Sequence, residues 1–563
     1  MKYLSRYLIF GFVLILGFTT SCNDELNQSP LDAPANTNFF SNKDELTMAI
    51  NGAYTGLWWG GDPMPIYLDN ITDLGFLRSG YNGMKSVGQG AATSETGEFQ
   101  STWDHMYSSI SKCNNLLENM SRAKDNVSDD FFTRIQAEAR FLRAFYYFWL
   151  TELYGDVPLL TKVPKADEAK VARTPQNEVV NQIIKDLDFA AQNLPNSWSG
   201  SDVGRATKGA ALTLKARTAL LNGRYDVAAT AAKSVMDMGI YSLYPNYEEL
   251  FQYPGVRSSE VILDAPYQKG VRTTGLPIKE GTRNVGAWST IVPSQFMVDT
   301  YEATDGKQID ESSLYDPQHP FENRDPRLDA SIIRPGSIFA GYVFYTHPDS
   351  TMTWYVQDGQ KKRVTNQDVT NPYATYTGYC WRKYNSPQDF PQNIQSSELN
   401  FIYMRYAEDL LTYAEAKIEQ GNIDQSVLDA INKVRARAYG VDPSQTNQYP
   451  AVTTMNQDQL RKEVRYERTV EFANEGLRLF DIRRWKIGKD VMDGTLVGRP
   501  KGAYTTVPNT PDIDENGHPH YDGMMDLFRS VEQRSFDPKR DYLWAIPQKE
   551  LDVNDKMSQN PGY

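Results

Sequence analysis

Apolar residues recur every three or four positions through long stretches of this chain, and these stretches occur as consecutive pairs. That spacing puts the apolar side chains on one face of an α-helix, and such a face is stable in water only when another element covers it. The strongest stretch runs from Asp129 to Tyr154, and its partner runs from Thr174 to Leu194. The pattern therefore predicts helices that pack pairwise, which makes the fold mainly α.

Two further pairs carry small residues where their helices would cross. In one pair, Ala210–Leu220 and Ala228–Ala232 flank a tight turn at Asn222–Gly223, and the other pair spans Arg405–Tyr439. Alanine lets two helix backbones approach closely, and the pattern is similar to that of tetratricopeptide repeats. We therefore predict a tetratricopeptide-like helix-pair platform that begins with a helix near Ser41.

Residues 240–400 lack a sustained helical period and are rich in Pro, Gly, Tyr and Asn. Short extended pieces are expected at Glu260–Ala265 and Ile338–Tyr345. The aromatic residues spread through this region favour order, and a long irregular segment in a compact protein commonly carries function. We predict a large, ordered, loop-rich insertion in the platform.

The N-terminus has the pattern of an export signal that ends at Cys22. Lys2 and Arg6 precede an apolar run, Leu8–Leu16, which is too short to span a bilayer. The pattern resembles a bacterial lipoprotein signal, in which Cys22 carries acyl chains such as palmitate and becomes the first mature residue. Acyl chains alone can anchor a domain to a membrane. The alternative is an ordinary secretory signal with an incidental cysteine.

These observations divide the chain into a signal peptide (1–21), a lipidated flexible tether (22–40) and a single domain (41–563). The domain comprises a helical platform (41–239 and 401–490), the insertion (240–400) and a C-terminal segment (491–563). Cys113 and Cys380 are the cysteines of this domain, and the sequence leaves open whether they pair.

The charge and the aromatic content restrict the class of ligand. The net charge is −13, and no Lys/Arg block is present, so we expect no nucleic-acid partner. Aromatic residues make up 12% of the chain, which is more than a core of ordinary helices requires. Some rings are therefore expected on the surface, where their flat faces can bind ligands.

No motif indicates catalysis, a cofactor or a metal. The five histidines lack HExxH spacing, and neither GxSxG nor a glycine-rich phosphate loop occurs. The run Asp512–Gly517 opens like a calcium loop, but its twelfth position is Gly523 in place of Glu. Carboxylates after the first helix are expected to bind sugar hydroxyls or cap helices; they are Asp62, Asp69, Asp73, Glu95 and Glu98.

Several segments spread over the whole chain share the patterns of one family. They are the Cys22 leader, Ala137–Pro158 (AEARFLRAFYYFWLTELYGDVP), Met404–Lys417 (MRYAEDLLTYAEAK), Arg465–Trp485 (RYERTVEFANEGLRLFDIRRW), Tyr542–Pro547 (YLWAIP) and Gln559–Tyr563 (QNPGY). Together they resemble the SusD/RagB family of outer-membrane nutrient-binding lipoproteins. Within Arg465–Trp485, Glu and Arg residues three or four apart suit ion pairs on helix faces, so we interpret this motif as scaffold.

The resemblance implies a lipid-anchored protein at the cell surface that lies over a SusC-like, TonB-dependent barrel of the outer membrane. It would capture a glycan and pass it to that barrel without altering it. The barrel partner follows from the family alone.

The candidate ligand-binding residues come from the chemistry of sugar recognition. Sugar C–H faces stack on aromatic rings, and planar polar groups at the rim replace water around the hydroxyls. The candidates are Trp58, Trp59, Tyr67, Asp69, Asp73, Arg78, Tyr81, Trp288 and Trp354. Trp103, Trp149 and Trp485 lie on periodic helices and are expected in the core.

Three alternatives to glycan binding remain open at the sequence level. A peptide-binding member of the same family would have the same scaffold. A helical-repeat scaffold could associate with a barrel and have no affinity for small molecules. A glycoside hydrolase would require two carboxylates at a fixed separation in an aromatic cleft.

Overall fold

The structure is a computed structural model that describes residues 39–78, 83–501 and 507–563. The predicted signal peptide, Cys22 and all but the last two residues of the predicted tether lie outside these residues. Among the helices of the described part, none combines the length and the apolar character needed to cross a bilayer.

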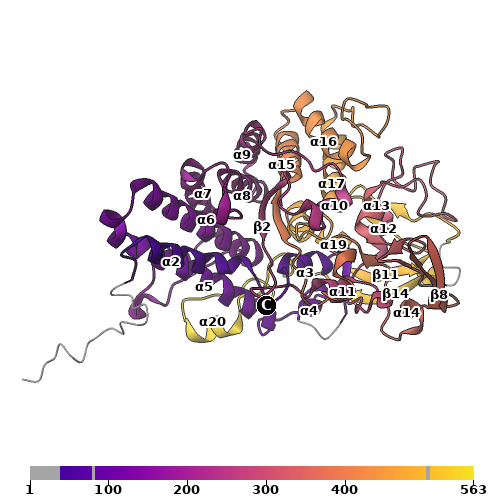
Figure 1. Cartoon of the computed structure of the whole chain (residues 1–563), viewed down its shortest axis with the longest axis horizontal. Coiled ribbons are helices and arrows are strands. Elements are labelled where there is room, and N and C mark those ends of the chain that lie inside the picture. The colour runs from indigo at the N-terminus through magenta and orange to yellow at the C-terminus, as the bar shows by residue number, and fades with distance from the viewer. Residues whose placement is uncertain (1–38, 79–82, 502–506) are drawn as a thin grey trace, which may run out of the picture.

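The longer helices build the platform, which occupies the left and upper parts of Figure 1. They are α2 (Lys43–Tyr54), α5 (Gly97–Asn119), α6 (Asp129–Tyr154), α7 (Gln176–Asn193), α8 (Lys208–Leu221), α9 (Tyr225–Asp237), α15 (Tyr406–Glu419), α16 (Gln425–Ala438), α17 (Gln457–Glu471) and α18 (Arg478–Trp485). The mainly α fold and its helix-pair platform are therefore confirmed.

The central helix of the platform is α6, which packs against α5 and α7. The Ser128 side chain caps its start by accepting the N–H of Phe131 at 3.3 Å. Gly155 ends the helix with φ of 74°, a conformation that glycine adopts at little cost. Trp149 is buried toward the C-terminal end of the helix, as expected from the periodic pattern.

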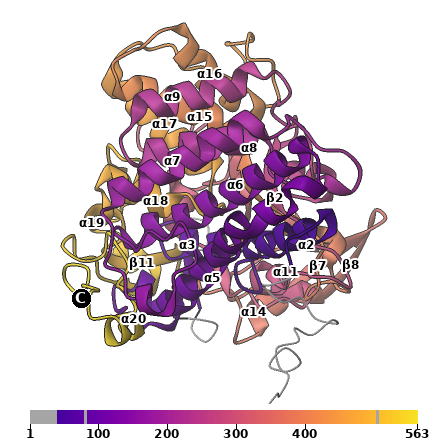
Figure 2. The ribbon, with the colours of Figure 1, turned by 90° about the vertical axis from the view of Figure 1, so that its left-hand side faces the viewer.

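Small residues allow α9 to lie against both α8 and α15. Ala219, Ala228 and Ala416 form a fully buried cluster at this crossing. Larger side chains there would hold the helices apart, so the predicted role of alanine in close packing is confirmed. Figure 2 shows α7, α8 and α9 stacked as neighbouring layers beside α15–α17.

The insertion is ordered and consists of short strands and short helices. Its strands are β2 (Val261–Ala265), β3 (Ile291–Pro293), β4 (Ile332–Ile333), β5 (Ile338–Phe339), β6 (Tyr342–Val343), β7 (Met352–Gln357), β8 (Gln360–Thr365) and β9 (Cys380–Trp381). Its helices are α10 (Tyr247–Leu250), α11 (Leu276–Glu280), α12 (Gln295–Thr300), α13 (Arg327–Ser331) and α14 (Gln367–Thr370).

Two details of the insertion differ from the sequence prediction. The expected extended piece Ile338–Tyr345 is a hairpin of β5 and β6, because Ala340 and Gly341 both have positive φ and turn the chain. The hairpin of β7 and β8, which completes a four-stranded sheet in the order β5-β6-β7-β8, was not predicted. Its turn is Asp358–Gly359, also at positive φ.

Strand pairing connects the insertion to the rest of the chain. At its two ends, β2 pairs antiparallel with β10 (Phe401–Arg405), the strand that leads into α15. Further elements are α3 (Met64–Asn70), β1 (Gly75–Leu77), α4 (Met84–Gly88), α19 (Gly488–Val491), β11 (Gly494–Pro500), β12 (Asp512–Ile513), β13 (Pro519–His520), β14 (Phe528–Arg534) and α20 (Gln548–Val553). The remaining pairs are β1–β3, β4–β9, β11–β14 and β12–β13.

Glu471 of α17 lies at the centre of a buried ion network. It accepts hydrogen bonds from Arg405 Nη1 at 2.6 Å, from Arg327 Nη1 at 3.2 Å and from Arg437. These arginines belong to β10, α13 and α16, so one carboxylate joins the platform to the insertion. Glu260, just before β2, extends the network by binding Arg405 and Arg437, each at 2.8 Å.

The predicted ion pairs of Arg465–Trp485 exist, but most of them connect different elements. Arg468 of α17 pairs with Asp481 of α18 at 3.0 Å, and Arg484 pairs with Glu415 of α15 at 2.6 Å. All four side chains are almost fully buried. Arg484 and Asp481, 2.8 Å apart, form a pair of the predicted kind, three residues apart on one helix. The other pairs connect neighbouring elements because α15 and the insertion cover these helix faces. The scaffold role of the motif fits this burial.

Replacement of Glu471 tests the network. Burial alone would raise the pKa of Glu471, but Arg437, Arg405 and Arg327 lower it from 4.5 to about 2. Removing one partner of a buried ion pair costs about 3–5 kcal/mol, so we expect Glu471→Gln to lower the free energy of unfolding by that amount at pH 7, measured by urea denaturation.

Two comparisons make this prediction specific. Because the pKa of Glu471 is lower in the folded state, its stabilisation is present above pH 4.5 and is lost toward pH 2, so the difference between wild type and variant should narrow at pH 3. Glu463→Gln, on the same helix but at a side chain exposed to 29%, should cost no more than about 1 kcal/mol. Equal losses for both variants would contradict a central role of Glu471.

Cys113 and Cys380 are both buried and unpaired. Burial raises the pKa of Cys113 from 9.0 to about 12 and also raises that of Cys380. Thiolates react with disulfide reagents and thiols do not, so both residues should be inert in the native fold. In a soluble version that begins at Asn23, Ellman's reagent should detect two thiols only after denaturation. Rapid labelling of native protein would contradict the burial.

Candidate ligand-binding site

Arg78 joins the early part of the chain to the insertion. It follows β1, and its N–H donates to the Thr290 carbonyl oxygen at 2.9 Å, which extends the pairing of β1 with β3. Its guanidinium donates to the carbonyl oxygens of Tyr373 at 2.9 Å and of Ala374 at 2.6 Å. The guanidinium carbon also lies 4.2 Å from the centre of the Tyr376 ring.

Tyr373 and Tyr376 present their rings to solvent. Their exposed fractions are 62% and 46%, in a protein in which most aromatic side chains are buried. The loop that carries them follows α14, and the Asn371 side chain accepts the N–H of Tyr373 at 2.8 Å. The Tyr376 ring also stacks on Phe76 of β1, with ring centres 5.9 Å apart. We call Arg78, Tyr373 and Tyr376 the tyrosine–arginine surface.

A cavity of about 780 Å³ opens beside Tyr376, and we call it the α14 cavity. Its walls come from α14, the loop that follows it, the end of β11 and β14, which lie together at the right-hand end of Figure 1. Polar side chains line much of it, among them Asp368, Asn371, Thr375, Lys501 and Arg529. The volume is in the range of about 300–1,000 Å³ that ligand pockets commonly have.

Arg283 contacts the tyrosine–arginine surface, and Trp288 lies nearby in the chain. Arg283 Nε donates to the Tyr373 carbonyl oxygen at 2.7 Å, so two arginines share this acceptor. Trp288 is half-buried, and it lies two residues before Thr290, the backbone partner of Arg78. The backbone of Trp288 is therefore close to that of Arg78, another predicted site residue.

A second polar cluster surrounds Asp62. Its carboxylate accepts the Thr274 hydroxyl at 2.9 Å and the Gly275 N–H at 3.0 Å, and it also contacts Lys279. Lys279 Nζ lies 2.8 Å from the hydroxyl of Tyr67. Because the Lys279 carbonyl oxygen accepts the N–H of Thr290, this cluster adjoins the strand pair that holds Arg78.

Trp58 is half-buried at the start of residues 58–78, which we call the early segment. Its indole N–H donates to the Pro266 carbonyl oxygen at 2.7 Å, and Arg272 lies over its ring at 5.5 Å. Trp58 stays a candidate because part of its ring is accessible.

Trp59 and Tyr67 are part of the core, although we predicted that they bind ligand. Trp59 packs edge-on against Trp149, with ring centres 5.1 Å apart, and is buried. Tyr67 is also buried, and burial together with Asp62 raises its pKa well above the usual range. Both face inward from the early segment, so they are no longer candidates.

Asp69 and Asp73 likewise have structural roles. Asp69 accepts the N–H groups of Glu475 at 2.9 Å and of Arg478 at 3.0 Å, which holds the start of α18. Burial raises its pKa from 3.8 to about 7. Burial alone would also raise the pKa of Asp73, but the Arg478 guanidinium, 2.7 Å away, lowers it below its usual value. The prediction that these two carboxylates face a ligand is not supported.

Two predicted residues lie away from this arrangement. Trp354 is exposed to 42% on β7, opposite Arg363 of β8, and it does not line the α14 cavity. Tyr81 lies outside the described residues.

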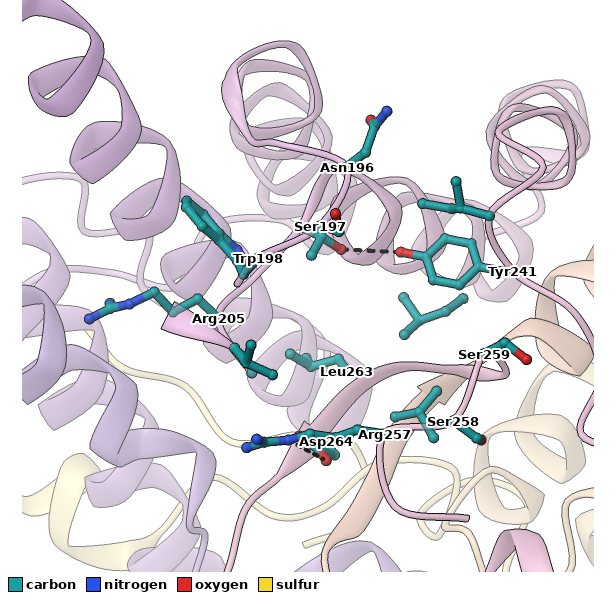
Figure 3. Close-up of a pocket in the computed structure, with 16 residues that line it drawn as sticks. Asn196, Ser197, Trp198, Arg205, Tyr241, Arg257, Ser258, Ser259, Leu263 and Asp264 are labelled. Atoms are coloured by element: carbon teal, nitrogen blue, oxygen red, sulfur yellow. Dashed lines mark hydrogen bonds and ion pairs between the residues drawn. The ribbon is translucent and has the colours of Figure 1, made fainter. Parts of the chain in front are cut away.

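A smaller cavity of about 240 Å³ lies between the platform and β2. Figure 3 shows Trp198, Tyr241 and Leu263 around it, with Asp264 and Arg257 at one edge. The Tyr241 hydroxyl is 3.3 Å from that of Thr207, and Arg257 Nε is 3.8 Å from Asp264. Its volume is below the usual range for ligand pockets, so the α14 cavity is the better candidate.

Sequence reasoning missed most of the residues that form the α14 cavity and its rim. Tyr373 and Tyr376 lie in the run NPYATYTGY, where Asn-Pro indicates a turn and hence an exposed loop tip. That signal could have identified the two tyrosines. Lys501 and Arg529 come from the C-terminal segment, and no local pattern connects them to residues 371–376.

Comparison with known proteins identifies the family. The SusD family model matches residues 248–563, and a second model, described as starch-binding associating with outer membrane, matches residues 25–220. The chain is 26% identical to SusD-like protein P2 of Formosa agariphila, and the match covers 100% of both chains. It is 25% identical to the starch-binding protein SusD of Bacteroides thetaiotaomicron, over 70% of this chain and 73% of that protein.

A solved structure agrees with these matches. The crystal structure of a SusD-like carbohydrate binding protein from Bacteroides fragilis superposes with a TM-score of 0.79 at 29% identity. The superposition covers 92% of this chain and 100% of the other. These matches show that the chain belongs to the SusD family.

Proposed function

We propose that this protein binds an oligosaccharide at the cell surface and delivers it to a TonB-dependent transporter in the outer membrane. The observation that carries the proposal is the pair of exposed tyrosines, Tyr373 and Tyr376, beside the α14 cavity. Binding would leave the glycan chemically unchanged.

The chemistry of this region suits a sugar better than an apolar ligand. A sugar ring has C–H faces that stack on an aromatic ring and hydroxyls that need hydrogen-bonding groups at its edge. Tyr376 in the cavity wall and Tyr373 beside it supply the rings. Asn371, Thr375 and Arg529 supply polar groups within the cavity wall. Several sugar units can share such an open surface, so an oligosaccharide fits better than a single sugar.

Relatives with the same fold support a carbohydrate ligand. The Bacteroides thetaiotaomicron relative is named as starch-binding, and the Bacteroides fragilis structure is described as carbohydrate binding. The two matches cover 70% and 92% of this chain. Family membership and the geometry of the site thus favour the same ligand class.

The proposed location is the outer face of the outer membrane, with acylated Cys22 as the anchor. The leader pattern before Cys22 supports the anchor, and the family model that matches residues 25–220 is described as associating with outer membrane. A SusC-like barrel is the proposed recipient of the glycan.

Removal of the exposed rings tests ligand binding. We expect Tyr376→Ala and Tyr373→Ala each to weaken oligosaccharide binding about tenfold, which corresponds to about 1.4 kcal/mol for a lost stacking contact. Isothermal titration calorimetry with panels of oligosaccharides and peptides measures the change. Trp354→Ala removes a ring of similar exposure outside the cavity and should leave the affinity unchanged. Binding to peptides alone would refute the carbohydrate assignment.

Replacement of Cys22 tests the anchor. Without a thiol to acylate, Cys22→Ser should move the protein from the membrane fraction to the soluble fraction of the cell, because no described helix can span the bilayer. Immunoblotting of the two fractions measures the shift, and palmitate labelling should disappear with it. A variant that stays with the membrane in high salt would argue against lipid anchoring.

A further inference from the structure

Arginine side chains around the α14 cavity donate to backbone carbonyl oxygens. Arg78 and Arg283 donate to the backbone carbonyl oxygens of Tyr373 and Ala374. Arg529, in the cavity wall, has Nη2 3.4 Å from the Thr346 carbonyl oxygen. A carbonyl satisfies a donor without cancelling its formal charge, so the contact of Arg529 leaves its guanidinium positively charged.

Lys501 adds to this charge. It is exposed, lines the same cavity as Arg529, and its N–H donates to the Leu527 carbonyl oxygen at 2.6 Å, which fixes the backbone that carries it. The positive charge is notable because the whole chain has a net charge of −13. The charge that Arg529 and Lys501 bring to the cavity is therefore opposite in sign to the net charge of the chain.

The carboxylate in the cavity wall offsets this charge only in part. Asp368 is buried, and it accepts the backbone N–H of Arg283 at 2.6 Å and the side-chain amide of Asn284. Burial raises its pKa from 3.8 to about 7, so near neutral pH a large fraction is uncharged. Its oxygens also have partners within the protein, which leaves Arg529 and Lys501 to face a ligand.

We propose that the α14 cavity binds an acidic sugar unit, with Arg529 and Lys501 contacting its anionic oxygens, so that the glycan this protein takes is an anionic oligosaccharide. This inference rests on the proposed glycan-binding function and specifies the substrate class of that site. The shared chemistry is a sugar carboxylate or a sulfate ester, and an arginine fork suits the oxygens of either group. The aromatic rings of the tyrosine–arginine surface would hold the neighbouring sugar units.

Calorimetry with matched oligosaccharides tests the charge preference. The ligands are an acidic oligosaccharide, the same chain after reduction of its carboxyl groups, and a sulfated chain before and after desulfation. We expect the acidic form of at least one pair to bind at least about tenfold more tightly than its uncharged form. The preference should shrink between 50 and 500 mM NaCl because salt screens charges. The pair that loses affinity shows whether the carboxylate or the sulfate is recognised.

Charge removal then locates the effect. Lys501→Gln should reduce the affinity for the acidic ligand about fivefold or more and leave the affinity for the uncharged ligand unchanged. Arg529→Gln also removes a polar group from the cavity wall, so it should reduce the affinity for the acidic ligand at least about fivefold more than the affinity for the uncharged ligand. Lys501 is exposed, so its variant keeps the test decisive if Arg529→Gln does not fold. Arg224→Gln is the matched control, since Arg224 also binds neutral oxygens, those of Asn181 and Asn177, but lies on the platform.

The outcomes separate this inference from the proposed function. Equal or tighter binding of the uncharged forms, or an unchanged preference in both variants, would overturn the acidic-sugar site while glycan binding stands. Failure of every acidic and uncharged oligosaccharide to bind would instead overturn the proposed function and this inference with it.

Discussion

The carboxylate of Glu471 determines how the helical platform and the insertion meet. Three arginines from β10, α13 and α16 converge on it, and each of these elements comes from a different part of the chain. A charge inside a protein is tolerated only when its partners are in place, because the loss of hydration is otherwise not compensated. The network therefore allows one arrangement of these elements and penalises others.

Buried carboxylates with specific partners also hold the early segment, which leads from the platform to the candidate site. Asp69 accepts the backbone N–H of Arg478, the first residue of α18, and Asp73 pairs with the guanidinium of the same arginine. Arg534 of β14 donates to the Gly75 carbonyl oxygen at 2.9 Å. These contacts hold the residues just before β1 and the first residue of the strand. Arg78, the next residue after β1, is thereby held at the loop of Tyr373 and Tyr376. The carboxylates that we expected to touch ligand instead hold the segment that leads to Arg78.

Much of the fold was predictable because helices leave a local signal. The bounds of α6 match the apolar stripe of Asp129–Tyr154, since period and capping both lie within that segment. The hairpin of β7 and β8 also had a signal, the Asp358–Gly359 turn, which went unused. The site was harder to predict because its residues come from β1, the insertion and β14, and burial decides which polar groups stay available. The misassigned Trp59 shows this limit, since a core tryptophan and a binding tryptophan look alike in sequence.

Arginine has two different roles in this protein, and its acceptors distinguish them. Where arginines meet carboxylates, as at Glu471, charge is neutralised and the contact contributes to the fold. Where an arginine meets a backbone carbonyl, as at Arg529, the contact orients the guanidinium and its charge remains. An acidic chain that used only the first kind would repel an anionic ligand over its whole surface. At the α14 cavity, Arg529 lies in the same wall as the exposed Lys501 and provides local positive charge. Salt limits the opposing repulsion from the rest of the acidic chain to distances of about 10 Å.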